Sequence, residues 1–65
     1  MAFNGRGNDY LSLKQYGKAI SDYNEAIRLK PDFALALLNR ADCYEKLGNN
    51  KAAQRDRAKA KELTK

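Results

Sequence analysis

Apolar residues recur along this chain at steps of three and four positions, which is the spacing of one face of an α-helix. No run alternates apolar and polar residues as a half-buried β-strand would. The pattern therefore predicts an all-α protein with four helices. Their main apolar members are Phe3, Gly7, Tyr10 and Leu13; Ala19, Ile20, Tyr23, Ala26 and Ile27; Phe33, Leu37, Ala41, Tyr44 and Leu47; and Ala53, Ala60 and Leu63.

The ends of these helices follow from the residues between the apolar stripes. The second helix is expected over about 17–29 and stops before Pro31, whose ring steers the preceding residue out of the helical region. Asp32 is predicted to cap the N-terminus of the third helix. Gly48 and the two asparagines after it end that helix, and the fourth then covers about 51–63. Such short connections predict two antiparallel hairpins.

The chain also resembles itself when it is shifted by 34 residues. The shared residues are mostly small or apolar, and they are Ala2/Ala36, Arg6/Arg40, Tyr10/Tyr44, Leu13/Leu47, Ala19/Ala53, Asp22/Asp56, Ala26/Ala60 and Leu29/Leu63. A fixed period of roughly 20 to 50 residues is the signature of stacked repeats. Repeats of this kind bury their apolar faces against one another and present surfaces to partners, so the period favours a binding protein over an enzyme.

The order of large and small residues within one period resembles that of the tetratricopeptide repeat (TPR) family. The matching positions are Phe3, Gly7, Tyr10, Tyr16, Ala19, Tyr23, Ala26 and Pro31. The second copy matches less completely, because Arg57 stands at the late aromatic position and Lys65 at the proline position. The resemblance implies two repeats, at 1–33 and 34–65, stacked as a short right-handed α-solenoid of helix-turn-helix hairpins.

In this family the first helix of each hairpin lines a concave face that binds ligands. The resemblance places eight residues of this chain on that face: Asn4, Asn8, Leu11, Leu35, Leu38, Asn39, Asp42 and Glu45. An apolar patch of leucines edged by asparagines and acids suits a helix or a peptide of a partner protein. The same leucines are alternatively covered by the protein's own N-terminus or by a second copy of the chain.

One ligand of the family, the carboxylate end of a chaperone tail, is not expected here. The domains that bind it use two asparagines together with lysine and arginine side chains spread over three repeats. Asn8 and Asn39 stand at the asparagine positions, but Asn4 occupies the first lysine position. The 65 residues also hold no third repeat to supply the other cations. The resemblance therefore implies an incomplete carboxylate site.

The positive charge of the chain is concentrated in its last helix. The net charge is +5, and residues 51–65 contribute +4 of it, with six Lys and Arg against two Asp and Glu. Gln54, Arg57 and Lys61 stand where the first repeat has apolar or aromatic residues, so we expect a polar, basic capping helix that ends the stack. Nucleic-acid binding through this helix is a remote alternative, because no aromatic side chain is interleaved with the charges for base stacking.

The composition argues against catalysis. Histidine, the commonest general base at neutral pH, is absent, and Cys43 in mid-helix is better explained as a small buried residue than as a nucleophile. We predict no enzyme, no catalytic residues, no cofactor and no metal. No apolar run approaches the roughly 20 residues of a membrane helix. The single cysteine fits a reducing, cytoplasmic location.

Two repeats are fewer than the three or so that this architecture usually needs. A chain that starts directly on repeat positions is expected of a fragment of a longer array or of an engineered minimal unit. We expect another molecule to complete its exposed side, and a homo-oligomer through the first and third helices would cover Phe3, Leu35 and Leu38. The favoured function is a protein-protein interaction module for a peptide, a helix or a second copy. The alternative is a self-assembling scaffold unit without a separate ligand.

Overall fold

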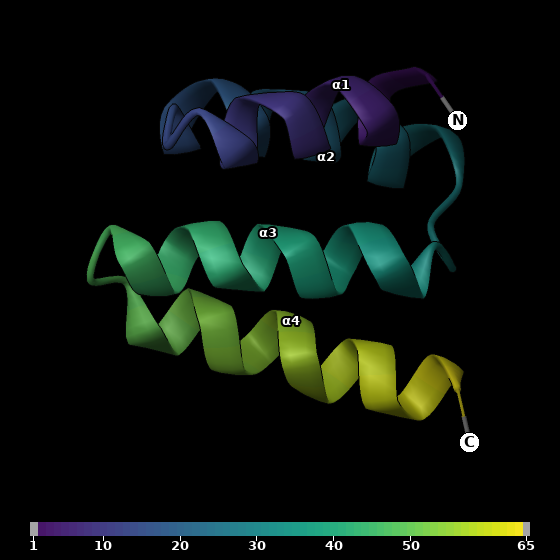
Figure 1. The fold of residues 1–65 in the computed structure, drawn as a ribbon. Coiled ribbons are helices and arrows are strands. Elements are labelled where there is room, and N and C mark those ends of the chain that lie inside the picture. The colour runs from purple at the N-terminus through teal and green to yellow at the C-terminus, as the bar shows by residue number, and fades with distance from the viewer. Residues whose placement is uncertain (1, 65) are drawn as a thin grey trace.

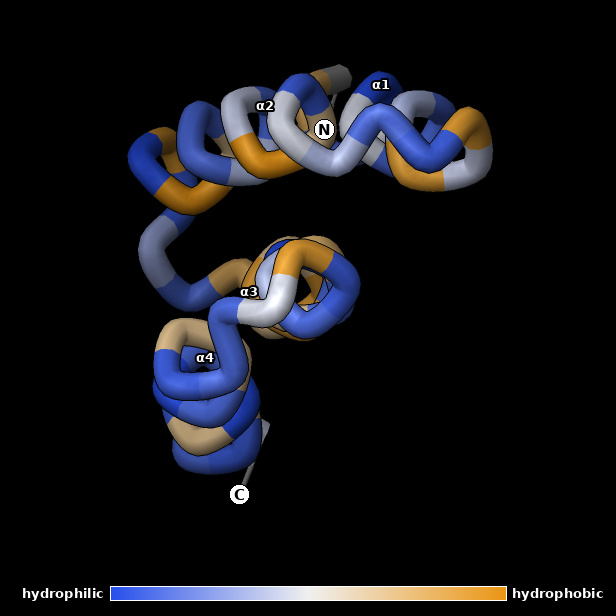
Figure 2. Tube along the Cα trace, turned by 90° about the vertical axis from the view of Figure 1, so that its left-hand side faces the viewer, coloured by the Kyte–Doolittle hydropathy of each residue, from blue (hydrophilic) through white to orange (hydrophobic). Residues whose placement is uncertain are grey.

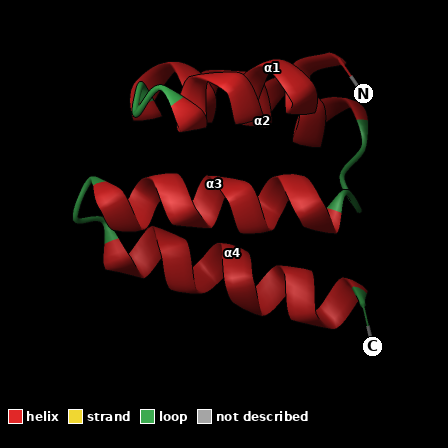
Figure 3. Ribbon diagram, viewed as in Figure 1, coloured by secondary structure: helices red, strands yellow, loops and turns green. Residues whose placement is uncertain are grey.

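The computed structural model describes residues 2–64, which form four α-helices and, over that range, no strand. α1 covers Ala2–Ser12, α2 covers Tyr16–Leu29, α3 covers Ala34–Lys46 and α4 covers Asn50–Leu63 (Figures 1 and 3). The predicted all-α class and the four predicted helices are confirmed.

The helices form two antiparallel hairpins that stack one on the other. α1 packs against α2 and α3 against α4, while α2 also packs against α3 and so joins the hairpins. Figure 1 shows α1 and α2 in an upper layer, α3 below them and α4 lowest. The molecule measures 31 × 26 × 15 Å. Only a narrow strip of residues is fully buried, and most of them are alanines.

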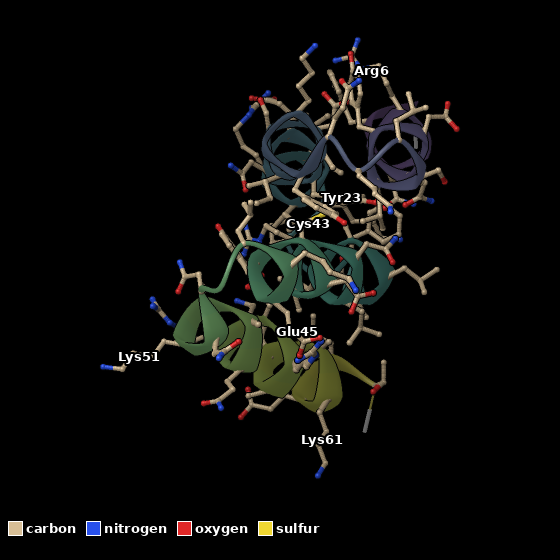
Figure 4. The ribbon with its side chains drawn as sticks, turned by 60° about the vertical axis from the view of Figure 1, so that its left-hand side comes forward. Arg6, Tyr23, Cys43, Glu45, Lys51 and Lys61 are labelled. Carbon is tan, nitrogen blue, oxygen red and sulfur yellow. The ribbon has the colours of Figure 1, made fainter. Side chains whose placement is uncertain are left out.

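The core consists of small residues around one large ring. Tyr23 is fully buried and lies between the two hairpins, close to Cys43 (Figure 4). Small residues let helices approach closely, and the gaps between them are filled by larger side chains. Cys43 is itself buried, as predicted. The other buried apolar residues come from α2, α3 and α4, and they are Ala19, Ala26, Ala36, Leu37, Ala41, Ala53 and Ala60.

Gly7 is required by the close approach of α1 to Tyr23. A Cβ atom at Gly7 would lie only 2.7 Å from Cε1 of the Tyr23 ring, far inside van der Waals contact. Gly5, two positions earlier on the same helix, would direct a Cβ into open space. The expectation that Gly7 has a packing role is confirmed, and the residue explains why an otherwise unfavourable helix residue is present in α1.

The predicted cap of the third helix is wrong. Phe33, not Asp32, is the N-cap residue of α3, and its side chain makes no capping hydrogen bond. The reason is a tight turn with Pro31 and Asp32 at its centre, closed by the backbone N–H of Phe33, which donates to the carbonyl of Lys30 at 3.0 Å. The helix therefore starts one residue later than expected, while the Phe33 ring packs against the core. α4, in contrast, has a side-chain cap, because Oδ1 of Asn49 accepts from the backbone N–H of Ala52.

The turns inside the two hairpins share one geometry. Lys14 and Gly48 both adopt positive φ angles, of 60° and 84°, and they are equivalent positions of the two repeats. The residue after each of them donates its N–H to the carbonyl of a tyrosine five positions earlier, at 2.9 Å and 2.8 Å. Only glycine adopts this conformation without steric cost, so the first hairpin carries a strained residue where the second does not.

Candidate functional site

The residues predicted for a partner-binding face lie on α1 and α3. Leu35, Leu38, Asp42 and Glu45 follow steps of three and four along α3, so they share one side of that helix. The two leucines are 62% and 40% exposed, although large apolar side chains usually avoid water. Among residues 2–64, nothing covers these two leucines, so this side of α3 begins with an exposed apolar patch and continues with two acids.

A hydrogen-bond network joins α1 to α3 on the same face. Nδ2 of Asn39 donates to Oδ1 of Asn8 at 2.9 Å, and the hydroxyl of Tyr23 donates a short hydrogen bond to the same oxygen. The pKa of Tyr23 is raised to about 12, chiefly because burial disfavours the phenolate, with smaller effects from nearby acidic groups. The hydroxyl therefore stays protonated at neutral pH and holds the Asn8 amide in one orientation.

Leu11 and Asn4 of α1 are less accessible than the leucines of α3. Both are half-buried, and Leu11 packs against the core instead of standing free on the surface. Oδ1 of Asn4 is buried and has no hydrogen-bond partner among the residues that the structure describes. A buried acceptor without a partner is costly, so this amide is a weak point of α1. These two residues therefore form the inner margin of the predicted face.

The acidic residues of the face already have a counter-ion. Arg57 of α4 reaches back to Oδ1 of Asp42 at 3.2 Å and to Oε2 of Glu45 at 3.0 Å. Arg57 is the repeat equivalent of Tyr23, and Asp42 is the equivalent of Asn8, so one contact occurs twice with different chemistry. The sequence predicts only a solvated capping role for Arg57. The structure adds a second role, because the long side chain reaches α3 and makes α4 part of the face.

Two arginine–aspartate pairs that the sequence did not predict join the helices of each hairpin. Arg6 binds Asp22 through two hydrogen bonds of 2.8 Å, and Arg40 binds Asp56 through bonds of 2.8 Å and 2.7 Å. The Arg6 guanidinium lowers the pKa of Asp22 chiefly by its hydrogen bonds. Both acids are buried, and each pair ties the first helix of a hairpin to the second. The sequence does contain a sign of these pairs, since the two arginines and the two aspartates are among the residues repeated at a spacing of 34.

Metal and membrane sites find no support in the described part of the chain. Among residues 2–64, no three His, Cys, Asp or Glu side chains are grouped closely enough to hold a metal ion. No helix in this range has both the length and the apolar character that crossing a bilayer demands. Burial raises the pKa of the Cys43 thiol, which disfavours the nucleophilic thiolate.

Comparison with known families agrees with this geometry. The family described as "TPR repeat" matches residues 7–48, across the junction of the two hairpins, and the family described as "Tetratricopeptide repeat" matches residues 34–65. The chain belongs to the tetratricopeptide repeat family. Its stacked hairpins, the close approach at Gly7 and the buried repeat alanines are the structural form of that family's pattern, and membership places the chain among protein-interaction modules.

Several curated proteins resemble this tetratricopeptide repeat unit along most of its length. An Hsp70-Hsp90 organizing protein of Triticum aestivum is 43% identical over 58 residues, and Hsp70-Hsp90 organizing protein 2 of Arabidopsis thaliana is 40% identical over the same length. Dynein axonemal assembly factor 4 of Pongo pygmaeus is 45% identical over 58 residues. Each alignment covers 89% of this chain but only 10% to 14% of the relative. The chain thus spans a small part of these proteins.

Proposed function

We propose that this tetratricopeptide repeat unit binds a helix or a peptide of a partner protein on the face formed by α1 and α3. The observation that supports the proposal most is the exposure of Leu35 and Leu38 beside the Asn8–Asn39 amide pair. Burying a leucine side chain is worth about 1.5–3 kcal/mol, so two leucines supply a substantial part of a binding energy. The leucines would provide affinity and the amides would orient the ligand.

The amide pair suits the backbone of a peptide. Within the described residues, Nδ2 of Asn8 and Oδ1 of Asn39 make no hydrogen bond, while the other two polar atoms of the pair bind each other. One donor and one acceptor therefore remain for a ligand, which matches the carbonyl and the N–H of a peptide group. Tyr23 fixes the orientation of Asn8, so little side-chain freedom is lost on binding.

Chaperones are a partner class to test, because relatives of this chain are named for organizing Hsp70 and Hsp90. A tail recognised only by its terminal carboxylate is not part of the proposal, since Asn4 stands where the family's carboxylate site has a lysine. Arg57 does not replace that lysine, because Asp42 and Glu45 already bind it. An internal segment with apolar side chains fits the face better. A reducing, cytoplasmic setting belongs to the same proposal.

The second candidate is self-assembly, in which another copy of the chain covers the leucines. The thin core and the two exposed leucines favour this reading, since a second copy would bury apolar surface that one copy leaves in water. Phe3 contributes little to such an interface, because it is half-buried against the core. In this case the protein is a scaffold unit without a separate ligand.

The molar mass in solution separates the two candidates. Light scattering behind a sizing column, from micromolar to near-millimolar protein, is expected to show a folded monomer if the face is free for a partner. A stable dimer that dissociates in the variant L35E/L38E would support the scaffold candidate instead. The variant L13E/L47E is the control, because Leu13 and Leu47 are exposed leucines that directly follow the last residues of α1 and α3.

Binding itself is tested with peptides selected against the protein from a displayed library. We expect L35E/L38E to weaken a selected apolar peptide by roughly tenfold or more, which corresponds to about 1.4 kcal/mol. L13E/L47E should bind normally, and circular dichroism should show that both variants keep their helices. Equal loss of affinity in the two variants would contradict the proposal, because it would locate the site elsewhere.

A further inference from the structure

A groove lies between α3 and α4, away from the face that carries Leu35 and Leu38, which we call the leucine face. Its volume is about 500 Å³, and polar or charged side chains form most of its lining: Arg40, Tyr44, Asn49, Arg55, Asp56 and Lys59. Arg40 and Leu38 are two positions apart on α3, which separates them by about 200° around the helix axis. The groove and the leucine face therefore open on different sides of the second hairpin.

Arg40 is part of the groove's framework and is not free for a ligand. Its guanidinium donates hydrogen bonds to Asp56, at 2.8 Å and 2.7 Å, and to Oδ1 of Asn24, at 2.8 Å. Its guanidinium also lies over the Tyr44 ring, 5.7 Å from the ring centroid, which is within the limit of about 6 Å for a cation–π contact. Since Arg40 neutralises Asp56, the one acid of the lining offers little repulsion to an incoming anion.

Arg55 and Lys59 supply the available charge. They stand one turn apart on α4, are both exposed, and form no ion pair within residues 2–64. Asn49 adds a polar donor, because its Oδ1 already caps α4 and its Nδ2 remains. The groove thus combines two unpaired cations, an amide donor and the edge of an aromatic ring.

The first hairpin shows that the fold does not require this charge. The positions equivalent to Arg55 and Lys59 are Ser21 and Glu25 there, and Glu25 forms an ion pair with Arg28 at 2.7 Å. The equivalent Arg–Asp pair is present in both hairpins, so this part of the framework is common. The first hairpin has one cation, Lys18 at the position of Ala52, beside the acid Glu25, whereas the groove of the second hairpin has the two cations Arg55 and Lys59.

We propose that the α3/α4 groove binds a carboxylate-rich segment of a partner protein. Arg55 and Lys59 pair with its acidic side chains, the Asn49 amide donates to its backbone, and the Tyr44 ring contacts its methylene groups. Charge complementarity carries the choice of ligand, since the net charge of the chain is +5. A nucleic acid fits less well, because α4 has no aromatic residue beside its cations on which bases could stack.

The test uses fluorescently labelled synthetic probes whose binding is followed by anisotropy. The probes are a twelve-residue peptide that alternates Glu with small residues, the same peptide with Gln in place of Glu, and an oligothymidylate of equal length. We expect the Glu peptide to bind and the Gln peptide to bind at least tenfold more weakly. Tighter binding of the oligothymidylate would overturn the proposal in favour of nucleic acid.

Two charge-matched double variants locate the site. R55E/K59E and K51E/K61E lower the net charge equally, but Lys51 and Lys61 lie outside the groove lining and project away from the hairpin (Figure 4). We expect R55E/K59E to lose at least tenfold in affinity for the Glu peptide, and K51E/K61E to lose less than threefold. Equal losses would overturn the proposal, because they would mean attraction by net charge alone.

Two further variants separate this groove from folding defects and from the leucine face. R55Q/K59Q removes the cations without adding acids beside Asp56, and it should reproduce the loss of affinity while its melting temperature stays close to that of the parent. L35E/L38E should bind the Glu peptide no more weakly than K51E/K61E does. If L35E/L38E abolishes this binding while R55Q/K59Q retains it, the acidic ligand occupies the leucine face and the groove is excluded.

Discussion

Arg40 and Asp56 form a two-pronged ion pair, with Nε to Oδ2 at 2.8 Å and Nη2 to Oδ1 at 2.7 Å, that ties α3 to α4. The pair of Arg6 and Asp22 repeats this geometry in the first hairpin. The two pairs differ in their surroundings, because the Arg40 side chain is 20% exposed and that of Arg6 is 59% exposed. Each hairpin is thus held by the same contact at a different depth.

We expect R40K to destabilise the protein more than R6K. A lysine cannot form two parallel bonds to a carboxylate, and water screens the charge of the less exposed Arg40 less than that of Arg6, while both acids are equally buried. The expected cost of R40K is about 1–2 kcal/mol, in line with the loss of one charge-assisted hydrogen bond. Urea unfolding followed by circular dichroism measures both variants. A larger loss in R6K than in R40K would show that exposure does not control these pairs.

Tyr23 predicts how stability depends on alkaline pH. Burial raises its pKa to about 12 in the folded protein, against an ordinary value of 10.0. A raised folded pKa means that the contribution to stability is complete below pH 10 and is lost as pH rises towards 12. The urea concentration at the midpoint of unfolding should therefore decrease as the pH is raised from 10 to 12.

The variant Y23F is the control for this titration. It keeps the ring but has no proton to lose, so its stability should change less over the same pH window, although the loss of the hydrogen bond to Asn8 lowers stability by about 1 kcal/mol at neutral pH. An identical alkaline decline in Y23F and the parent would mean that other groups cause the unfolding.

Gly7 and Gly5 form a matched pair for testing the close approach of α1 to α2. Alanine stabilises an exposed helix position by up to about 1 kcal/mol relative to glycine, so G5A should stabilise the protein. G7A gains the same propensity but drives a methyl group into the buried Tyr23 ring, and overpacking costs about 1–3 kcal/mol. G7A should therefore be less stable than G5A by about 1–3 kcal/mol in thermal or urea unfolding. Equal stability of the two would mean that the ring can shift.

Lys14 is the position at which the protein can be stabilised most directly. The left-handed backbone conformation destabilises a residue other than glycine by about 1–2 kcal/mol. Lys14 adopts this conformation, with a φ of 60°. K14G should gain about 0.5–1 kcal/mol after the extra freedom of the unfolded chain is subtracted. The reverse change G48A should cost a similar amount, since Gly48 has a φ of 84°. K14A tests the cause, and a gain in K14A as large as in K14G would point to the lost charge instead of the backbone.

The sequence predicts where the leucines of the candidate site lie on α3, but it does not predict which polar residues of different helices contact each other. The placement of Leu35 and Leu38 on an exposed side of α3 follows from helical spacing, because the core residues of α3 occupy other positions of the same period. The bond of Asn8 to Asn39 and the reach of Arg57 to Glu45 depend on how two helices cross, and one helix alone does not contain that information. The amide pair and the ion-paired acids were therefore visible only as separate polar residues.

The sequence by itself determined the helices, the repeat of 34 residues and the family, because helical periodicity, turn residues and the spacing of small side chains are local properties written along one chain. Figure 2 shows the same for α4, whose hydrophilic character over most of its length was plain from its residues. Only the tertiary structure decided that Arg6 and Arg40 bind Asp22 and Asp56, and that two cations of α4 remain unpaired beside a groove. Partners in these contacts are separated by 16 residues, so they meet only when the hairpins close and the packing of one helix on another selects which side chains face each other.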